Sequence, residues 1–482
     1  MLFNSYLFIL LFLPLTLAGY YLLNHFGRYR AATFFLLGMS LWFYGYANPA
    51  YLALIAASIA VNFALSRALG ARPRKVLLAG GILLNLAPLL YFKYCNFFLE
   101  NLNAVFGSSF TLRAIVLPLG ISFFTFQQIA WLVDSYRGQT HGYTWDEYAL
   151  FVAFFPKLTQ GPIALHGELI PQFRDPARRK ASALCFSRGL YVFALGLFKK
   201  VILADTFGAA TDWGFAGISG LSSLEALLVS LFYTFQLYFD FSGYCDMAVG
   251  IGLLFHIDLP QNFDSPYKAL SIPDFWNRWH ITLTRFLRTY LYFPLGGSRK
   301  GKLRTYCNIL VVFLVSGIWH GANWTFILWG LLHGLLNCLT RIFKKQWEKL
   351  HVVTRWFFTF MAVDLLWVMF RAGSIADAFS FYRELFRWSS FTIDNELLYH
   401  FNLKEFVWLG QALPLLGQIV NHIPGFYMWL FLFVSFFIVL NLRNNRELQF
   451  KPTVGRSLLT ALLLVWSIVS LSGVSTFLYS NF

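Results

Sequence analysis

The stretch YCNILVVFLVSGIWHGANWTFILWGLLHGLLNCLT, residues 306–340, contains no Asp, Glu, Lys or Arg. A helix needs roughly 20 residues to cross the hydrocarbon core of a bilayer, and backbone exposed to lipid at that depth must be regular. The stretch therefore predicts helical structure inside a membrane. Its 35 residues are short for two complete crossings and a turn, so we expect the central SGIWHGAN, residues 316–323, to form a turn or break within the protein body.

Similar apolar runs recur along the chain, whose 482 residues are 58% hydrophobic and only 12% charged. This pattern predicts an all-α polytopic membrane protein with about ten to twelve transmembrane helices, together with re-entrant and amphipathic helices. Since no linker or internal repeat divides the chain, we expect a single domain over residues 1–482. The first run lacks the basic segment and cleavage site of a signal peptide, which favours a retained helix. The runs cover approximately residues 5–23, 31–47, 50–66, 76–95, 114–135, 184–203, 222–240, 306–340, 356–370, 425–441 and 457–478.

Basic residues gather between these runs. A net charge of +16 alone is compatible with nucleic-acid binding. Clusters that flank membrane spans are better explained by the positive-inside rule, so we expect no nucleic-acid partner. The rule assigns the basic clusters to the cytoplasm and the more acidic segments 204–220 and 372–424 to the outside, with both termini outside. The basic clusters lie at residues 28–30, 67–75, 174–180, 298–304, 341–355 and 443–456.

The apolar segment 146–165 differs from the other runs. It lies between two basic loops, and Pro156, Gly161 and Pro162 interrupt it. Broken backbone at membrane depth is tolerated only where protein surrounds it or where it lines a cavity. We therefore expect a re-entrant segment here.

His320, inside the 306–340 stretch, is the leading candidate for chemistry, because ionisable residues in membrane segments indicate function. Imidazole titrates near neutral pH, and burial favours its neutral form, which suits a general base. Trp319, Asn323 and Trp324 are candidate walls of the site. Asn323, Trp324 and the backbone N–H groups at the break between Gly317 and Gly321 are candidate oxyanion donors. The alternative is a buried histidine that bridges two helices.

A second candidate region is SIPDFWNRWHITLTRFLRTYLYFPLGGSRKGKLR, residues 271–304, which predicts an amphipathic helix followed by a flexible basic loop. Its cations are suited to an anionic ligand such as a nucleotide phosphate. Binding of anionic lipid headgroups is the alternative. The candidate donor-binding residues are Arg278, Arg285, Arg288, Arg299 and Lys300.

Other polar residues within the apolar runs have a structural interpretation. Asp240 and Asp246 lie in strongly apolar sequence, so we expect them to be paired or hydrogen-bonded rather than directly catalytic. The five cysteines lack the spacing of a metal or redox site. We expect no bound metal.

Five blocks in order give the chain a family resemblance. It resembles the membrane-bound O-acyltransferases, particularly the bacterial branch of alginate and peptidoglycan O-acetylation membrane proteins. The resemblance implies that His320, in WHG, is the catalytic histidine and that His280, in RWH, is a second functional histidine. The family pattern commonly has Arg at the position of Asn277, Trp at that of Phe286 and an acid at that of Thr289. The blocks are MLFNSYLFILLFLPLTL (1–17), FFPKLTQGPI (154–163), YFDFSGYCDMAVGIGLLF (238–255), DFWNRWHITLTRFLRTYLYFPLGG (274–297) and SGIWHGANWTFILWGLLHG (316–334).

The resemblance also implies an activity. An acetyl group would pass from cytoplasmic acetyl-CoA, a substrate rather than a bound cofactor, through a central tunnel across the bacterial inner membrane toward an extracytoplasmic, alginate-like polysaccharide. The implied partner is an extracytoplasmic acetyltransferase of the Ser-His-Asp (SGNH) type. Tyr479, near the C-terminus, is a possible acyl relay by analogy with a related D-alanylation system; its alternative role is an interfacial aromatic residue. Alternatives for the whole chain are D-alanyl transfer to a cell-wall polymer and proton-coupled transport.

Overall fold

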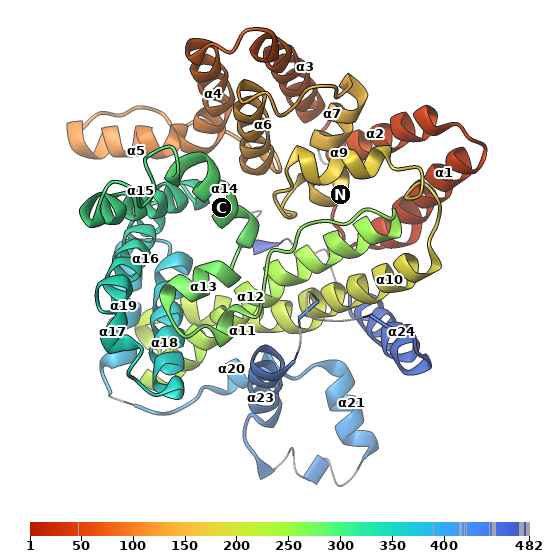
Figure 1. Ribbon diagram of the computed structural model, residues 1–482. Helices are drawn as coiled ribbons and strands as arrows, with labels where there is room; N and C mark the ends of the chain where they lie inside the picture. Colours follow the sequence, from red (N-terminus) through yellow and green to blue (C-terminus); the bar gives the residue numbers. More distant parts are fainter. Residues whose placement is uncertain are drawn as a thin grey trace.

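Every regular element that the structure describes is a helix (Figure 1). The computed structural model describes residues 1–482 apart from 47, 389, 414–416, 419, 421, 443, 446–449, 472–476 and 479–482. The α-helices are α1 (Leu13–His25), α2 (Tyr29–Gly45), α3 (Ala50–Ala71), α4 (Lys75–Leu89), α5 (Cys95–Phe106), α6 (Ile121–Tyr136), α7 (Trp145–Ala153), α8 (Phe155–Leu158), α9 (His166–Arg174), α10 (Ala183–Phe198), α11 (Asp205–Ala216), α12 (Ser223–Leu254), α13 (Ile272–Arg278), α14 (Ile281–Leu287), α15 (Lys302–His320), α16 (Trp324–Ile342), α17 (Lys344–Trp347), α18 (Val352–Arg371), α19 (Ile375–Phe386), α20 (Asn395–Tyr399), α21 (Lys404–Ala412), α23 (Phe426–Asn441) and α24 (Val454–Val469). Short π-helical turns, η1 (Phe8–Phe12), η2 (Leu90–Tyr94), η3 (Lys199–Ala204) and η6 (Arg288–Tyr292), adjoin α1, α4, α10 and α14.

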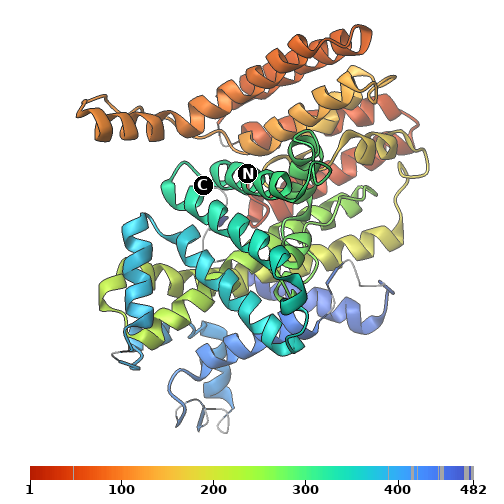
Figure 2. The ribbon, with the colours of Figure 1, turned by 60° about the vertical axis from the view of Figure 1, so that its left-hand side comes forward.

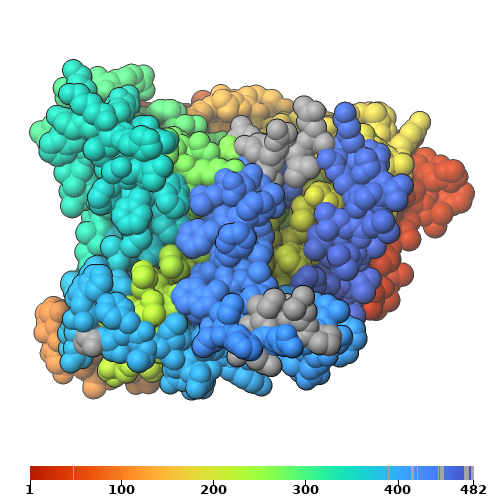
Figure 3. All heavy atoms as spheres, turned by 90° about the horizontal axis from the view of Figure 1, so that it is seen from below, coloured from red at the N-terminus to blue at the C-terminus, as the bar shows by residue number. Residues whose placement is uncertain are grey.

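The long apolar helices confirm a multi-pass membrane protein. Among the described residues, seven helical segments are long and apolar enough to cross a membrane, and α23 and α24 are shorter apolar helices. One of the seven is the bent arm α4–η2–α5, which runs along the upper edge of the molecule in Figure 2. On the face seen in Figure 3, the C-terminal third of the chain, in teal and blue, forms most of the surface. The seven segments are Phe8–His25, Ala50–Ala71, Lys75–Phe106, Ser223–Leu254, Lys302–His320, Trp324–Ile342 and Val352–Arg371.

The central element is α12, whose 32 residues are almost all buried. Ser222 and Glu225 form a capping box that starts the helix. Its backbone packs directly on α10, because a Cβ added at Gly243 would lie 2.8 Å from the carbonyl oxygen of Gly196. Small residues at such crossings let helices approach closely in a membrane.

Two ion pairs strengthen the contact of α12 with η3. Lys199 Nζ lies 2.6 Å from Asp246 Oδ2, and Lys200 Nζ lies 2.7 Å from Asp240 Oδ1. The expectation that both aspartates are paired is therefore confirmed.

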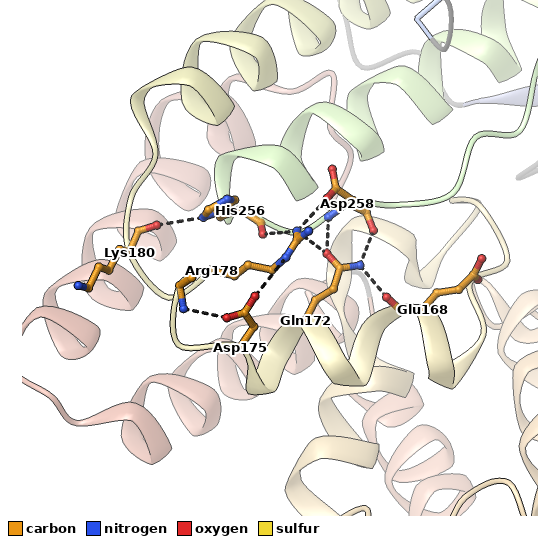
Figure 4. Close-up of polar contacts among 8 residues, drawn as sticks. Glu168, Gln172, Asp175, Arg178, Lys180, His256 and Asp258 are labelled. Carbon is orange, nitrogen blue, oxygen red and sulfur yellow. Dashed lines mark hydrogen bonds and ion pairs between the residues drawn. The ribbon is translucent and has the colours of Figure 1, made fainter.

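The chain leaving α12 is fixed by the basic loop that follows α9 (Figure 4). Arg178 Nη1 donates to Gln172 Oε1 at 2.7 Å, to the His256 carbonyl at 3.1 Å and to Asp258 Oδ2 at 2.8 Å. Asp258 N also donates to Gln172 Oε1, at 2.8 Å. These contacts hold the start of the segment that runs from α12 to His280.

The stretch 306–340 forms two packed helices, α15 and α16, joined at residues 321–323. The predicted break is confirmed, whereas the expectation that the stretch is too short for two crossings is wrong. Each helix has 19 residues, because α15 begins at Lys302 and α16 continues to Ile342. At 1.5 Å per residue each is roughly 28 Å long, close to the thickness of the hydrocarbon core.

The segment 146–165 is broken and enclosed, as expected. After α7 and α8 the chain is irregular, and residues 148–164 are all buried. Lys157 is 0% exposed, and its Nζ donates to Gln127 Oε1 at 2.6 Å. The irregular backbone is thus surrounded by protein, which is the condition for such backbone at membrane depth.

Candidate active site

The two predicted histidines lie side by side in the protein interior. His320 is the last residue of α15, and His280 immediately precedes α14. Their ring centroids are 6.4 Å apart, and their exposed fractions are 3% and 0%. Folding therefore joins two ionisable rings that are far apart in sequence.

Aromatic rings surround His320 from three helices. The ring centroids of Trp319, Trp329 and Phe370 lie 5.0, 5.2 and 5.3 Å from that of His320. These side chains come from α15, α16 and α18. The cage excludes bulk water and restricts the orientations that the imidazole can take.

His280 is held in an uncommon backbone conformation with a defined tautomer. Its φ of 45° is in the left-handed region, which non-glycine residues avoid unless their surroundings enforce it. Asn262 supplies that enforcement, since its Oδ1 accepts from Thr282 N at 3.2 Å and lies 3.1 Å from His280 Nδ1. The backbone N–H of Thr282 identifies this Asn262 atom as the amide oxygen, which can only accept a hydrogen bond. His280 Nδ1 is therefore assigned the proton, and His280 Nε2 carries the lone pair.

His320 borders a narrow cavity of about 50 Å³. Its walls come from the irregular chain before α6, from the enclosed segment after α8, from η2 and from the end of α15. The cavity therefore reaches the imidazole. The lining residues are Lys93, Leu117, Pro118, Leu119, Gly120, Ile121, Ser122, Phe123, Thr159, Gln160, Trp319 and His320.

A second cavity, of about 280 Å³, lies between the α13–η6 segment and the α15–α16 hairpin. Most of its wall is apolar, and Arg288 and Arg341 supply cations. It reaches Ser316, which lies one turn before His320 on the same face of α15. The arrangement suits an anionic group attached to an apolar or flexible chain.

Lys93 and Tyr94 contact the histidine's own helix, and sequence reasoning missed both. Lys93 Nζ donates to the carbonyls of Trp319 at 2.7 Å and His320 at 2.9 Å. Tyr94 Oη donates to the Ile318 carbonyl at 2.5 Å. A lone lysine in the apolar run 76–95 was the available signal, because a charge at that depth requires a partner.

Two predicted wall residues lie elsewhere. Asn323 caps α16 by accepting from Thr325 N at 3.1 Å, and its Nδ2 donates to the Gly373 carbonyl at 2.8 Å. Trp324 is 52% exposed, and its Nε1 donates to Asn101 Oδ1 at 2.9 Å. Neither lines the cavity at His320, so the expectation that they wall the site is wrong; Trp319 does line it.

The predicted donor-binding cations are dispersed. Arg278 pairs with Asp274 at 2.8 Å, and Arg285 pairs with Glu168 at 2.5 Å. Arg299 and Lys300 are exposed in the turn before α15. Arg288 is the predicted cation that lines the second cavity, together with Arg341, which sequence reasoning did not select.

Tyr479 lies outside the described residues. The preceding Phe477 is 1% exposed, and its ring centroid is 4.8 Å from that of Tyr244. Tyr244 is hydrogen-bonded to Thr159, which lines the cavity at His320. The described end of the chain therefore packs one residue away from the cavity wall.

Comparison with known proteins shows which family the chain belongs to. The model of the membrane-bound O-acyltransferase family, MBOAT, matches residues 81–375, which include both histidines and both cavities. The chain belongs to the MBOAT family. This MBOAT chain is 38% identical to the peptidoglycan O-acetyltransferase of Helicobacter pylori, over 100% of this chain and 98% of the relative. It is 39% identical to a probable alginate O-acetylase of Azotobacter vinelandii, over 88% of this chain and 85% of the relative.

A more distant similarity covers part of the MBOAT chain. It is 30% identical to the teichoic acid D-alanyltransferase of Streptococcus thermophilus, over 45% of this chain and 55% of that protein. Family membership makes the chain an acyltransferase, so the transporter alternative loses its support. Within the described residues, no group of three or more His, Cys, Asp and Glu side chains is arranged to hold a metal ion.

Proposed function

We propose that this chain is a membrane O-acetyltransferase that passes an acetyl group from cytoplasmic acetyl-CoA toward an extracytoplasmic polysaccharide. The supporting observation is the buried pair of His320 and His280 beside a cavity, in a chain similar over most of its length to a peptidoglycan and an alginate O-acetylating protein. The acceptor is a polysaccharide such as an alginate-like polymer or peptidoglycan. An SGNH-type acetyltransferase outside the cytoplasm completes the transfer.

The second cavity suits the donor. Arg288 and Arg341 offer guanidinium groups for phosphate oxygens, and the apolar wall suits the flexible arm that carries the thioester. Arg341 begins the basic cluster 341–355, and Arg288 precedes the cluster 298–304; the positive-inside rule assigns both clusters to the cytoplasm. Its volume is at the lower limit for a ligand pocket, so it would hold the arm rather than the whole nucleotide.

His320 acts as the general base in the proposed reaction. Its neutral imidazole takes the proton of an acceptor hydroxyl while the hydroxyl oxygen attacks the thioester carbonyl carbon. The carbonyl electron pair moves onto its oxygen, and collapse of this oxyanion expels the CoA thiolate. The thiolate takes the proton from the imidazolium, which leaves an ester, a free thiol and the original imidazole.

His280 and Tyr479 complete the proposal. His280 presents Nε2 as an acceptor, since Asn262 fixes its proton on Nδ1, and it orients the reacting groups beside His320. Tyr479 supplies the first acceptor hydroxyl and hands the acetyl group on. The packing of the buried Phe477 on Tyr244, which is hydrogen-bonded to Thr159 of the cavity wall, supports this role.

Reconstitution of the full chain in lipid vesicles tests the proposal. The measurement is release of free CoA from acetyl-CoA. We expect His320→Ala to lower the rate by about 10²- to 10⁴-fold, the usual contribution of positioned proton transfer. His25→Ala, at an exposed histidine, is the matched control and keeps the wild-type rate. Tyr479→Phe in the same assay stops formation of an acetylated protein if the tyrosine is the relay.

D-alanyl transfer is a second candidate, favoured by the similarity to a teichoic acid D-alanyltransferase. Acetyl-CoA and a D-alanyl-loaded carrier protein are compared as donors for the same vesicles. Consumption of the carrier thioester, with acetyl-CoA left intact, would establish the D-alanyl reaction and refute acetyl transfer.

A further inference from the structure

Lys93 is a cation beside His320 that has no role in the reaction proposed above. It lies in η2 of the bent arm, which is one of the seven candidate membrane spans. A charge at such a depth is expensive and is kept where protein groups or water receive it. Among the described residues no carboxylate pairs with Lys93, and its Nζ donates to the carbonyls of Trp319 and His320.

These contacts fix the turn that carries His320. The last carbonyls of an α-helix lack partners inside the helix, and the helix dipole makes that end attractive to a cation. Lys93 and Tyr94 together bind the carbonyls of residues 318–320, the last three residues of α15. The arm thereby holds the backbone of His320 in place.

The same lysine borders the space where the chemistry would occur. Lys93 and His320 line one cavity. An ammonium group has three N–H donors, and two of them are engaged by the carbonyls of α15. A cationic donor fixed in a water-poor site is suited to an oxygen on which negative charge develops.

We propose that Lys93 is a further catalytic residue that donates its third N–H to the oxyanion formed when the thioester carbonyl is attacked. The inference rests on the acyl transfer proposed above and adds the group that stabilises its intermediate. Asn323 and Trp324, two of the donors that the sequence suggested, do not line the cavity, whereas Lys93 does. No proton leaves the ammonium during the step.

Substitutions at Lys93 in reconstituted vesicles test the proposal. Removal of one oxyanion donor typically lowers kcat by about 10²- to 10³-fold, so we expect that loss in Lys93→Met, with KM for acetyl-CoA changed by less than about threefold. Lys93→Arg keeps the charge and the donors and is expected to recover at least about tenfold of the lost kcat. Lys75→Met, at an exposed lysine of the same helical arm, is the matched control.

The neutral variant Lys93→Gln separates the effect of the positive charge on kcat from the effect of the hydrogen bonds to α15. It keeps N–H donors, so equal kcat values for Lys93→Gln and Lys93→Arg would overturn the proposal, as would a Lys93→Met variant with wild-type kcat. If the methionine variant does not fold, the Arg and Gln pair decides the question. Absence of CoA release by the wild-type chain would instead refute the proposed function. If the wild-type chain releases CoA, His320→Ala does not, and Lys93→Met releases it at the wild-type rate, only the role of Lys93 is refuted.

Discussion

At the scale of single residues, the hydrogen bond from His280 to Asn262 predicts a measurable effect on turnover. Asn262→Ala removes the acceptor for His280 Nδ1, so the imidazole is free to place its proton on either nitrogen. Loss of a residue that orients a functional histidine typically lowers activity by about 10- to 100-fold, and we expect this fall in kcat with KM little changed. The measurement is CoA release by vesicles at saturating acetyl-CoA.

Asn262→Asp provides the contrast, because a carboxylate still accepts from Nδ1 and from the Thr282 backbone N–H. We expect it to retain more activity than Asn262→Ala. Equal losses in both variants would contradict a role in orientation and would indicate a packing role for the amide.

The sequence made His320 a candidate for chemistry because it is an ionisable residue within a long apolar run. The contacts that its neighbours make across the fold were not predictable from the sequence. The WHG motif and its apolar surroundings marked the imidazole as a candidate for chemistry. Asn323 and Trp324 were misplaced because neighbours along the chain diverge where a helix ends, and both turn toward Gly373 and Asn101. The apolar pattern around Lys93 indicated that the charge needs a partner but contained no information about which carbonyls receive it.

At the scale of helices, the α15–α16 hairpin depends on glycines at its crossing. A Cβ at Gly317 would lie 2.3 Å from the Phe326 carbonyl oxygen, far inside contact distance. Gly317→Ala must push the helices apart, and we expect a loss of about 1–3 kcal/mol in the free energy of unfolding, the usual cost of overpacking. Thermal unfolding of the purified protein in detergent measures this loss.

Gly38→Ala, within α2, is the matched control because nothing lies within 4 Å of its added Cβ. There alanine restricts the unfolded chain and favours the helix, so we expect stability unchanged or raised by about 0.5–1 kcal/mol. A Gly317→Ala protein as stable as the Gly38→Ala protein would mean that the two helices can separate at no cost.

The presence of the long helices was the part of the fold that the sequence predicted. Long runs without charge predicted the helices, and the length of the run 306–340, with SGIWHGAN at its centre, predicted the break between α15 and α16. Helix ends were less predictable, since Lys302 and Arg341 extend the hairpin beyond the uncharged run. Their long stems let the charges reach water while the backbone stays helical.

At the scale of the whole molecule, the proposed reaction requires the second cavity to open toward the cytoplasm, where acetyl-CoA is present. The basic clusters at residues 298–304 and 341–355 flank this cavity, and the positive-inside rule predicts that orientation, with both termini outside. The loop between α5 and α6 then lies on the opposite side, because the candidate span Lys75–Phe106 runs from the basic cluster 67–75 to that loop.

A matched pair of serine substitutions tests this orientation. In a background whose five native cysteines are replaced by alanine, Ser298→Cys and Ser109→Cys each place one thiol at an exposed position. In intact cells we expect an impermeant maleimide to label residue 109, and to label residue 298 after the membrane is permeabilised. The reverse pattern would place Arg288 and Arg341 outside, where no acetyl-CoA reaches them. It would therefore refute entry of the donor from the cytoplasm through the second cavity. The proposal that the paired histidines are the acyl-transfer site would stand.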